Sequence, residues 1–440
     1  MSAETSGTQK PGLQRSARGV AARVVHQVLE GDVFLSEVLD TELRRGHLED
    51  RDRALATELS YGAVRFERPL RARLAALAPR GVAEGDALAQ AHFLVAAYQL
   101  LLLDRVPAFA AINEAVEALS QLRGQKVAGF ANAVLRRLTK GAPLPRAEAL
   151  REALEPWLYE QMAAAVGAEA VLELLGSVTG AAHRGLCVRL SARCTEVPAW
   201  LSDSETGPLA PRARWLSPRG DLRRMPGYSE GLFAVQEEGA QWAALALGTR
   251  PGERVLDACA GHGTKAALLA EQLTPGGALW VNDVAAAKLE RLQREFVRLC
   301  LPAPSRHVVD LAAGVGDLPV GLDRVLVDAP CTGVGTLRRR PEIARRLRAE
   351  DAGRLGAQSV QLLSNAASLL KPGGRLVFVV CSVLPSECEA VVERRPSCLT
   401  PAPFDAPEAI AIAGAEASQY RLLPSLHGSD GYFVASFIRR

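Results

Sequence analysis

Two cysteines, Cys331 and Cys381, each follow an apolar run with the composition of a buried strand. Cys331 lies in DRVLVDAPCTGVG together with Asp328, and Cys381 closes RLVFVVCS. A cysteine thiolate is a strong nucleophile and leaves readily, so it suits a reaction that passes through a covalent intermediate. If the two strands are neighbours, both thiols face one crevice beside the carboxyl group of Asp328.

Methyl transfer to carbon 5 of a pyrimidine base is a reaction that uses two thiols and one carboxyl group. Carbon 5 is too weak a nucleophile to take a methyl group directly, but thiolate attack at carbon 6 converts the ring into a reactive enamine. Asp328 would stabilise the negative charge that this attack develops near N3 of the base, and the second thiol would remove the proton from carbon 5. Taken singly, either cysteine also fits a simple role as a small buried hydrophobic residue.

The chain after Gly239 contains the elements that would position these residues. Short apolar runs alternate there with amphipathic stretches such as TKAALLAEQL, a rhythm typical of βαβ units in a parallel sheet. Such sheets bind ligands at the carboxyl ends of their strands, so the polar residues that close the runs form the candidate site. The predicted strands are RVLDACAG, GALWVND, SRHVVD, DRVLVDAP and RLVFVVCS.

The first predicted strand continues into DACAGHGTKA, residues 257–266. Gly261 and Gly263 allow a tight turn and a close approach of a ligand to the backbone before the next helix. The turn does not complete the G-x-G-x-x-G fingerprint of dinucleotide sites, because Ala266 occupies the third glycine position. This disfavours a nicotinamide-dependent oxidoreductase, and a plain strand-to-helix turn is the simpler alternative.

Acidic residues close three successive predicted strands: Asp257, Asp283 and Asp310. A carboxylate at the end of the second strand can accept hydrogen bonds from ribose hydroxyls, and Asp283 has the spacing for that role. One such acid is usually a helix cap or a solvated group. Three of them at successive strand ends favour a cofactor of the adenosine type.

The first part of the chain is predicted to be helical. Residues 16–139 carry apolar residues at helical spacing, as in GVAARVVHQVLEG and INEAVEALSQL. The segment KGAPLPRAEALREALEP has the prolines and charges of a linker. In the stretch that follows, LYEQMAAAVG and VLELLG are expected to be helical and GLCVRLSA to be a strand.

The bulk composition is that of a globular protein with a mild basic excess. The 440 residues include 52 basic ones, nearly all Arg, against 49 acidic ones, which permits a nucleic-acid partner without requiring one and also fits a GC-rich genome. Arg338–Arg340 form either a solvated face or a phosphate-binding group. The eight cysteines include no C-x-x-C pair, which disfavours a zinc site and a disulfide framework. With neither a signal peptide nor a membrane span recognisable, we expect a cytoplasmic protein with no metal and no membrane partner.

The segments DAPCTGVGTLRRRPE and CSVLPSECE resemble the fourth and sixth motifs of the Nop/Sun family of RNA 5-methylcytosine methyltransferases. LLPSLHGSDGYFVASFIRR is similar to the closing strands of that family, and the helical region resembles the NusB RNA-binding fold. The combination covers nearly the whole chain and is typical of the members that act on small-subunit ribosomal RNA. The resemblance implies transfer of a methyl group from S-adenosylmethionine to carbon 5 of a cytosine in 16S rRNA through a covalent Cys–cytosine intermediate.

The resemblance also implies the fold and its boundaries. We expect an α/β Rossmann-like class I methyltransferase domain with a mostly parallel sheet, preceded by an all-α NusB-like domain, in a protein that acts as a monomer. The expected segments are a disordered tail at 1–14, the NusB-like RNA-binding domain at 15–142, a linker with a small α+β RNA-contacting subdomain at 143–240, and the methyltransferase domain at 241–440.

Carried onto this sequence, the resemblance makes Cys381 the nucleophile and Cys331 the residue that assists product release. The residues alone do not choose between the two thiols, because DNA cytosine methyltransferases use a proline-cysteine motif like Pro330-Cys331. Only the family pattern makes the assignment.

The cofactor is expected against the loop after the first strand, with its ribose at Asp283, its adenine near Asp310, and Asp328 between the cofactor and the target base. The family usually shows CAAPGGKT in this loop, whereas the chain has CAGHGTKA. This departure motivates an alternative function, a non-catalytic RNA-binding or ribosome-assembly factor that has lost cofactor binding. The expected cofactor-binding residues are Cys259, Ala260, Gly261, His262, Gly263, Thr264, Lys265, Asp283, Asp310 and Asp328.

Overall fold

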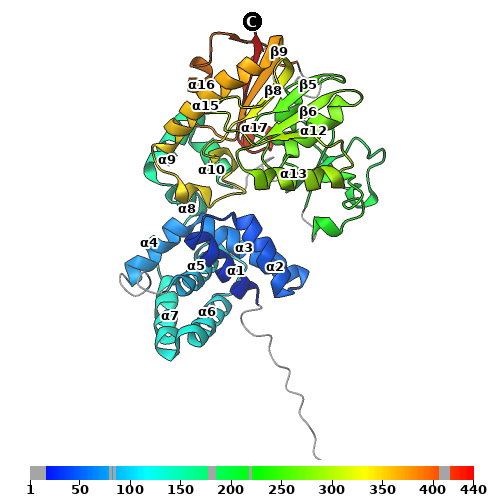
Figure 1. Ribbon diagram of the computed structural model, residues 1–440. Helices are drawn as coiled ribbons and strands as arrows, with labels where there is room; N and C mark the ends of the chain where they lie inside the picture. Colours follow the sequence, from blue (N-terminus) through cyan, green and yellow to red (C-terminus); the bar gives the residue numbers. More distant parts are fainter. Residues whose placement is uncertain (1–15, 79–81, 83–85, 177–184, 218–220, 406–416) are drawn as a thin grey trace, which may run out of the picture. The chain divides into compact units, whose positions relative to one another are not determined.

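The computed structural model describes residues 16–78, 82, 86–176, 185–217, 221–405 and 417–440. The chain forms two compact units, a helical unit and an α/β unit (Figure 1). Each unit is made of two segments of the chain. The helical unit comprises Met1–Tyr159 together with Arg339–Arg346, and the α/β unit comprises Glu160–Arg338 and Leu347–Arg440. The tail expected at 1–14 lies outside the described residues.

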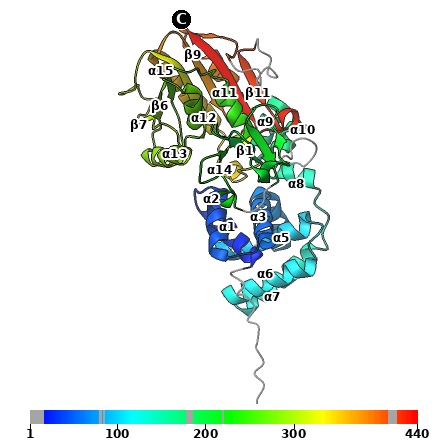
Figure 2. The same ribbon diagram turned by 90° about the vertical axis from the view of Figure 1, so that its right-hand side faces the viewer.

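The helical unit confirms the all-helical prediction for the first part of the chain. Its first helix begins after Ser16, whose hydroxyl accepts a hydrogen bond from Gly19 N at 3.1 Å, which satisfies a free donor of the first turn. Helices α6 and α7 pack side by side (Figure 2). The helices are α1 Ala17–Glu30, α2 Leu35–Gly46, α3 Asp50–Arg65, α4 Glu67–Leu77, α5 Ala87–Leu102, α6 Ala108–Arg123, α7 Gln125–Leu138 and α8 Arg146–Glu152, and the division between the units falls within α9 Pro156–Val166.

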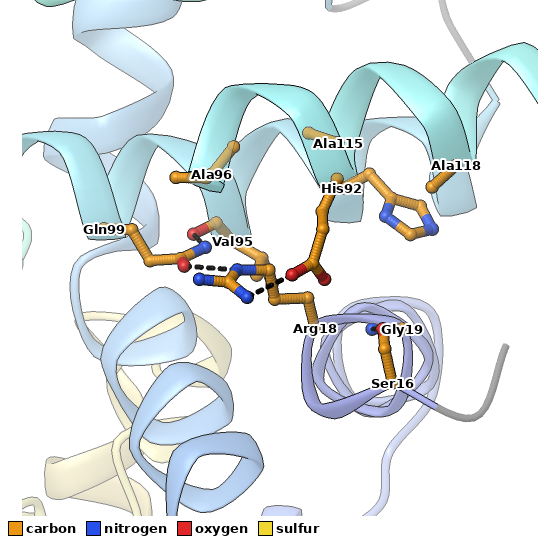
Figure 3. Close-up of a pocket in the computed structure, with 11 residues that line it drawn as sticks. Ser16, Arg18, Gly19, His92, Val95, Ala96, Gln99, Ala115 and Ala118 are labelled. Atoms are coloured by element: carbon orange, nitrogen blue, oxygen red, sulfur yellow. Dashed lines mark hydrogen bonds and ion pairs between the residues drawn. The ribbon is translucent and has the colours of Figure 1, made fainter. Parts of the chain in front are cut away.

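A small polar pocket lies between α1, α5 and α6 (Figure 3). Arg18 donates from Nε to Gln99 Oε1 at 2.7 Å and forms an ion pair with Glu114. Burial lowers the pKa of His92, which also lines the pocket, to about 4, so this imidazole is neutral at physiological pH. The Arg18 guanidinium therefore joins three helices through charge-assisted hydrogen bonds.

The segment Arg339–Arg346 follows the Cys331 loop in sequence but packs as part of the helical unit. It includes the short helix α14 Ile343–Arg346. The carboxylate of Glu342 accepts a hydrogen bond from Leu35 N at 3.1 Å and so caps α2, whose own N-cap residue Phe34 supplies no side-chain bond. Arg345 Nη1 donates to Leu29 O at 2.8 Å.

The α/β unit is built on a mostly parallel sheet, as predicted for a class I methyltransferase fold. The strand order is β10-β12-β9-β8-β5-β6-β7, with β11 paired to β12. Figure 1 labels the central strands β9, β8, β5 and β6. The strands from β9 to β7 pair in parallel, whereas β12 runs antiparallel to β9, β10 and β11. The strands are β5 Arg254–Asp257, β6 Ala278–Asn282, β7 Ser305–His307, β8 Leu322–Asp328, β9 Leu370–Val380, β10 Leu399–Pro401, β11 Gln419–Leu422 and β12 Tyr432–Arg439.

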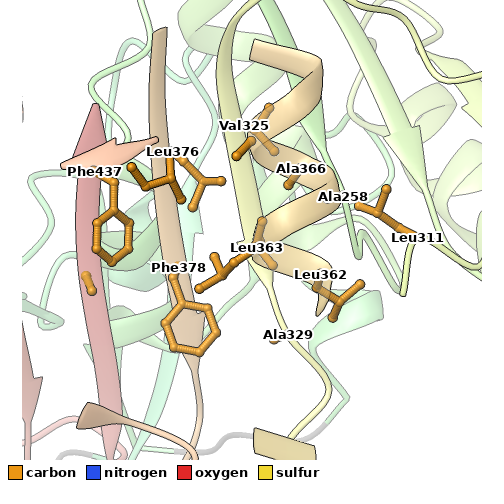
Figure 4. Close-up of a cluster of buried hydrophobic side chains, with 14 of the residues drawn as sticks. Ala258, Leu311, Val325, Ala329, Leu362, Leu363, Ala366, Leu376, Phe378 and Phe437 are labelled. Carbon is orange, nitrogen blue, oxygen red and sulfur yellow. The ribbon is translucent and has the colours of Figure 1, made fainter. Parts of the chain in front are cut away.

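Alternate residues of β8 belong to different hydrophobic cores, because successive side chains of a strand point to opposite faces. Val325 and Val327 pack with Leu363 of α15 (Figure 4), whereas Leu326 packs with Leu269 of α12. Both faces of the central strands are thus covered by helices, which holds the strand ends in fixed positions. The helices are α10 Ala168–Leu174, α11 Glu238–Leu245, α12 Thr264–Leu273, α13 Ala286–Arg298, α15 Asp351–Leu369, α16 Glu389–Glu393 and α17 Pro424–His427.

A second, antiparallel sheet precedes the large one and includes the strand expected from GLCVRLSA. Its order is β2-β3-β1-β4, with β1 Leu186–Leu190, β2 Glu205–Thr206, β3 Ala213–Leu216 and β4 Phe233–Val235. The buried Glu238 accepts hydrogen bonds from Leu209 N and Trp215 Nε1, both at 2.6 Å. Among the helices of the described residues, none has the length and apolar character needed to cross a membrane.

Replacing Glu342 by Ala is expected to lower the free energy of unfolding of the helical unit by about 1 kcal/mol, because Leu35 N loses its capping acceptor. Denaturant unfolding followed by circular dichroism measures the change. Glu350→Ala is the matched control, since Glu350 is exposed and supplies no side-chain cap to α15. Equal stability of the two variants would show that Glu342 does not cap α2.

Candidate active site

The two cysteines meet at the carboxyl ends of β8 and β9. These strands pair in parallel with Asp328 opposite Val379, and Gly335 N donates to Cys381 O at 3.0 Å, which ties the loop after β8 to the end of β9. The sulfur atoms of Cys331 and Cys381 lie 3.2 Å apart, within hydrogen-bonding distance. The predicted convergence of the two thiols is therefore observed, while their individual roles stay predictions.

Lys265 and Asp328 form an ion pair in the same site. Lys265 lies in the first turn of α12 and is buried, and its Nζ is 2.6 Å from Asp328 Oδ2. The ammonium also lies 5.9 Å from the centroid of the Tyr432 ring. The sequence assigned Lys265 to the cofactor loop, but the geometry also places it among the residues that could act on the base.

The surroundings of Cys331 favour its protonated form. The hydrogen bond to Cys381, followed by burial, raises the pKa of the Cys331 thiol well above its ordinary value. Burial alone would lower the pKa of Lys265, but attraction to Asp328 and to Cys381 raises it overall. Lys265 is therefore cationic, and Cys381 is one of the groups that favour this charge.

The loop between β5 and α12 is shaped by Asp283 at the end of β6. The buried Asp283 carboxylate accepts hydrogen bonds from Gly261 N at 3.0 Å and from Ala285 N at 2.9 Å, and it lies 3.5 Å from Lys288 Nζ. Asp310 lies after β7, is exposed, and accepts a hydrogen bond from Ala312 N at 3.1 Å. Each carboxylate retains lone pairs that could accept ligand hydroxyls.

Asp257 is the buried group best suited to a cationic ligand. It ends β5 and is 1% exposed. Burial and then the nearby Asp328 raise its pKa to about 7, and this effect outweighs the attraction to Lys265 and the backbone of Cys259. A buried carboxyl group that its surroundings do not fully compensate is costly in the absence of a ligand. The residues present thus fit S-adenosylmethionine, which carries an ammonium and a sulfonium centre.

The remaining loop residues lie between β5 and α12, where the sequence places them. Gly263 has a φ of +83°, and a Cβ atom there would lie 2.4 Å from Leu292 Cγ on α13, so glycine is required. A Cβ atom at Gly261 would meet nothing within 4 Å, which leaves open space beside the turn. His262 and Thr264 are exposed, whereas Cys259 and Ala260 are half-buried.

Two of the three arginines after the Cys331 loop, Arg338 and Arg340, contact protein groups. Arg338 forms an ion pair with the buried Asp430 at 3.1 Å, and the guanidinium of Arg340 lies 4.9 Å from the centroid of the Phe34 ring. Neither alternative, a solvated face or a phosphate-binding group, describes Arg338, because its guanidinium is mostly buried against a carboxylate.

Sequence reasoning missed Asn282, which precedes Asp283. Its side chain is buried, donates to Ala258 O and Val309 O at 3.0 Å, and accepts from Val309 N at 2.9 Å. It thereby holds together the ends of three strands that form the cofactor edge. Two adjacent polar residues, Asn282 and Asp283, at the end of an apolar strand could have indicated this role in the sequence. Among the described residues, no cluster of His, Cys, Asp and Glu side chains is arranged to hold a metal ion.

Two family models match the chain over separate regions. The model for "16S rRNA methyltransferase RsmB/F" matches residues 244–438, and the model for the "NusB family" matches residues 15–140. The chain is 32% identical to ribosomal RNA small subunit methyltransferase B of Pseudomonas syringae, covering 86% of this chain and 85% of that protein. It is 31% identical to the enzyme of the same name from Pseudomonas putida, covering 96% and 98%.

Solved structures support the fold. The crystal structure of PH0851 has a TM-score of 0.82 at 21% identity, covering 98% of this chain and 99% of that one. The structure of NSun6 from Pyrococcus horikoshii with SFG has a TM-score of 0.55 at 15% identity, covering 66% and 99%. At these identities the likeness concerns the fold alone.

The sheet order, the acidic strand ends and the paired thiols define a class I methyltransferase, which is preceded in the chain by a NusB-like helical unit. The sequence matches then identify the family. The chain belongs to the RsmB/F family of S-adenosylmethionine-dependent rRNA methyltransferases.

Replacing Asp257 by Asn is expected to raise the unfolding temperature of the ligand-free protein, and to raise it more at pH 8 than at pH 5. The folded-state pKa of about 7 lies above the ordinary 3.8, so the unchanged protein loses stability as the pH rises from about 4 through 7. The variant has no such titration, and the gain at pH 8 is on the order of a few kcal/mol.

Differential scanning calorimetry at the two pH values tests this expectation. Asp310→Asn is the control, because that carboxylate is exposed. A gain from Asp257→Asn that is equal at both pH values would contradict the burial of a titrating carboxyl group.

Proposed function

We propose that the chain transfers a methyl group from S-adenosylmethionine to carbon 5 of a cytosine in 16S rRNA through a covalent bond between Cys381 and carbon 6 of the base. The observation that carries the proposal is the 3.2 Å separation of the Cys331 and Cys381 sulfur atoms beside the Lys265–Asp328 ion pair. The 16S substrate is supported by the description of the matching family and by the names of the relatives. That the chain acts as a cytoplasmic monomer stays a prediction.

Cys381 is the proposed nucleophile. Cys331 holds its proton because of the sulfur–sulfur hydrogen bond, whereas Lys265 lies close enough to Cys381 for mutual attraction. The thiolate of the pair is therefore favoured at Cys381, and a thiolate is the form that attacks carbon 6. This gives a physical reason for an assignment that the residue types alone left open.

Lys265 is proposed to act on the ring during the attack, and Asp328 is proposed to hold its ammonium group in place. Addition of sulfur to carbon 6 develops negative charge toward N3 and O2 of the cytosine. An ammonium that is already held against Asp328 needs no rearrangement to stabilise that charge. Bound S-adenosylmethionine supplies the electrophilic methyl group, and Asp257, Asp283 and the turn at Gly261 are proposed to hold it.

Cys331 is proposed to remove the proton from carbon 5. Once Cys381 is bonded to the base, its sulfur no longer bonds to Cys331, and the largest cause that raises the pKa of Cys331 is lost. Cys331 then ionises more readily and gives its own proton to solvent, and the resulting thiolate accepts the proton from carbon 5. Elimination of Cys381 from carbon 6 restores the aromatic ring and releases the RNA.

Replacing Cys381 by Ala is expected to abolish methylation, while replacing Cys331 by Ala is expected to trap a covalent protein–RNA adduct. The first variant lacks the attacking sulfur, and the second lacks the group that frees carbon 5 of its proton. Denaturing gels with labelled small-subunit RNA detect the adduct, and bisulfite sequencing locates the modified cytosine. Cys300→Ser is the control, because Cys300 is exposed. Normal turnover by Cys331→Ala without a covalent adduct would contradict the two-thiol mechanism.

We expect isothermal titration calorimetry to detect binding of S-adenosylmethionine to the unchanged protein. Asp283→Ala is expected to lower the affinity roughly tenfold or more, because loss of about 1.4 kcal/mol of hydrogen bonding changes a dissociation constant tenfold. The variant loses both the ribose acceptor and the acceptor for Gly261 N. Asp317→Ala is the control, because that carboxylate is 77% exposed. Failure of the unchanged protein to bind would favour the alternative of a non-catalytic RNA-binding factor.

A further inference from the structure

A buried carboxylate connects the residues that follow the two cysteines. Thr332 comes directly after Cys331, and Ser382 comes directly after Cys381. Glu387 Oε1 accepts a hydrogen bond from Thr332 N at 2.7 Å, and Glu387 Oε2 accepts from Thr332 Oγ1 and from Ser382 Oγ, each at 2.5 Å. The two hydroxyl oxygens lie 3.4 Å from each other.

The three side chains of this cluster are enclosed by protein. Glu387 is 1% exposed, Thr332 is 6% exposed and Ser382 is fully buried. Ser382 Oγ also accepts a hydrogen bond from Leu384 N at 3.2 Å, so the same hydroxyl fixes the turn that leads from β9 to Glu387. Hydrogen bonds to an ionised acceptor are about twice as strong as those between neutral groups, and loss of such an acceptor leaves buried donors unsatisfied.

We propose that Glu387 is a positioning residue that sets the separation of the two reactive sulfurs by holding Thr332 and Ser382 on one carboxylate. The inference rests on the proposed function for its catalytic consequence, although the geometry of the two sulfurs can be measured without RNA or cofactor. Each bonded residue is one peptide unit from a reactive cysteine, so a shift of either loop moves a sulfur directly. A carboxyl group that served a purely local role would need to bind only one of the two loops.

Catalysis by this site is sensitive to that separation. Cys381 must reach carbon 6 while Cys331 reaches the proton on carbon 5, which are neighbouring atoms of one ring. Misplacement of a reacting group by about 1 Å can cost on the order of 100-fold in rate. The hydrogen bond from Gly335 N to Cys381 O does not involve Glu387 and still links the loops when Glu387 is changed. A Glu387 variant is therefore expected to retain the fold but to change the distance between the two sulfur atoms.

The test uses the full-length protein with Glu387→Gln and Thr332→Val, and with Glu389→Gln as the matched control. Glu389 lies two residues further on, is partly exposed and pairs with Arg421. The first readout is the rate at which dibromobimane, a short reagent that bridges neighbouring thiols, cross-links Cys331 to Cys381, with the bridged peptides identified by mass spectrometry. Scanning calorimetry establishes that each variant is folded.

The expected result is slower cross-linking in Glu387→Gln and Thr332→Val and an unchanged rate in the control. With RNA, kcat is expected to fall roughly 10- to 100-fold in Glu387→Gln, with the KM for S-adenosylmethionine within about twofold, and the protein–RNA adduct is expected to persist longer. Cross-linking and turnover like those of the control would overturn the proposal. If Cys381→Ala still methylates RNA, the proposed function fails, while the cross-linking rates still decide whether Glu387 positions the thiols.

Discussion

The parallel pairing of β8 with β9 is the interaction on which the site depends. Because the two strands are parallel neighbours in one sheet, their carboxyl ends lie at the same edge. A cysteine follows the end of each strand within three residues. The strands cannot slip relative to each other, since a shift by one residue would turn Val325 and Val327 away from the core against α15. Hydrophobic packing on both faces thus keeps the two strand ends side by side, and their loops place the two sulfur atoms 3.2 Å apart.

Electrostatics then differentiates the two chemically identical side chains. Lys265 provides a positive charge near Cys381, while the hydrogen bond to Cys381, burial and the nearby carboxylates raise the pKa of the Cys331 thiol. A sequence motif cannot express this difference, because it depends on where α12 places its first turn. The assignment of Cys381 as the nucleophile stays a proposal that the cysteine variants test.

Much of the fold followed from local patterns. The alternating runs predicted β5, β6, β8 and β9, and the helical spacing predicted the first unit, because hydrophobic periodicity reflects the face that each element buries. Contacts between distant segments could not be predicted in this way. Glu342 caps a helix more than 300 residues earlier in the chain. Glu387 joins two loops through Thr332 and Ser382, and no sequence pattern indicates these contacts. The sequence predicted the turn between β5 and α12 as the cofactor loop, but the ion pair of Lys265 with Asp328 depends on packing.

The strand ends proposed to bind the cofactor include a group that lowers the stability of the ligand-free protein, and interactions elsewhere in the unit compensate for it. Asp257 is almost fully buried, and its surroundings raise its pKa to about 7, chiefly through burial and then through Asp328. Burial of this carboxyl group disfavours folding of the ligand-free chain. It persists because Asn282 and Asp283 fix the surrounding backbone through hydrogen bonds with several segments. A ligand cation that neutralises Asp257 removes part of this penalty, so binding and stability are coupled at one carboxyl group.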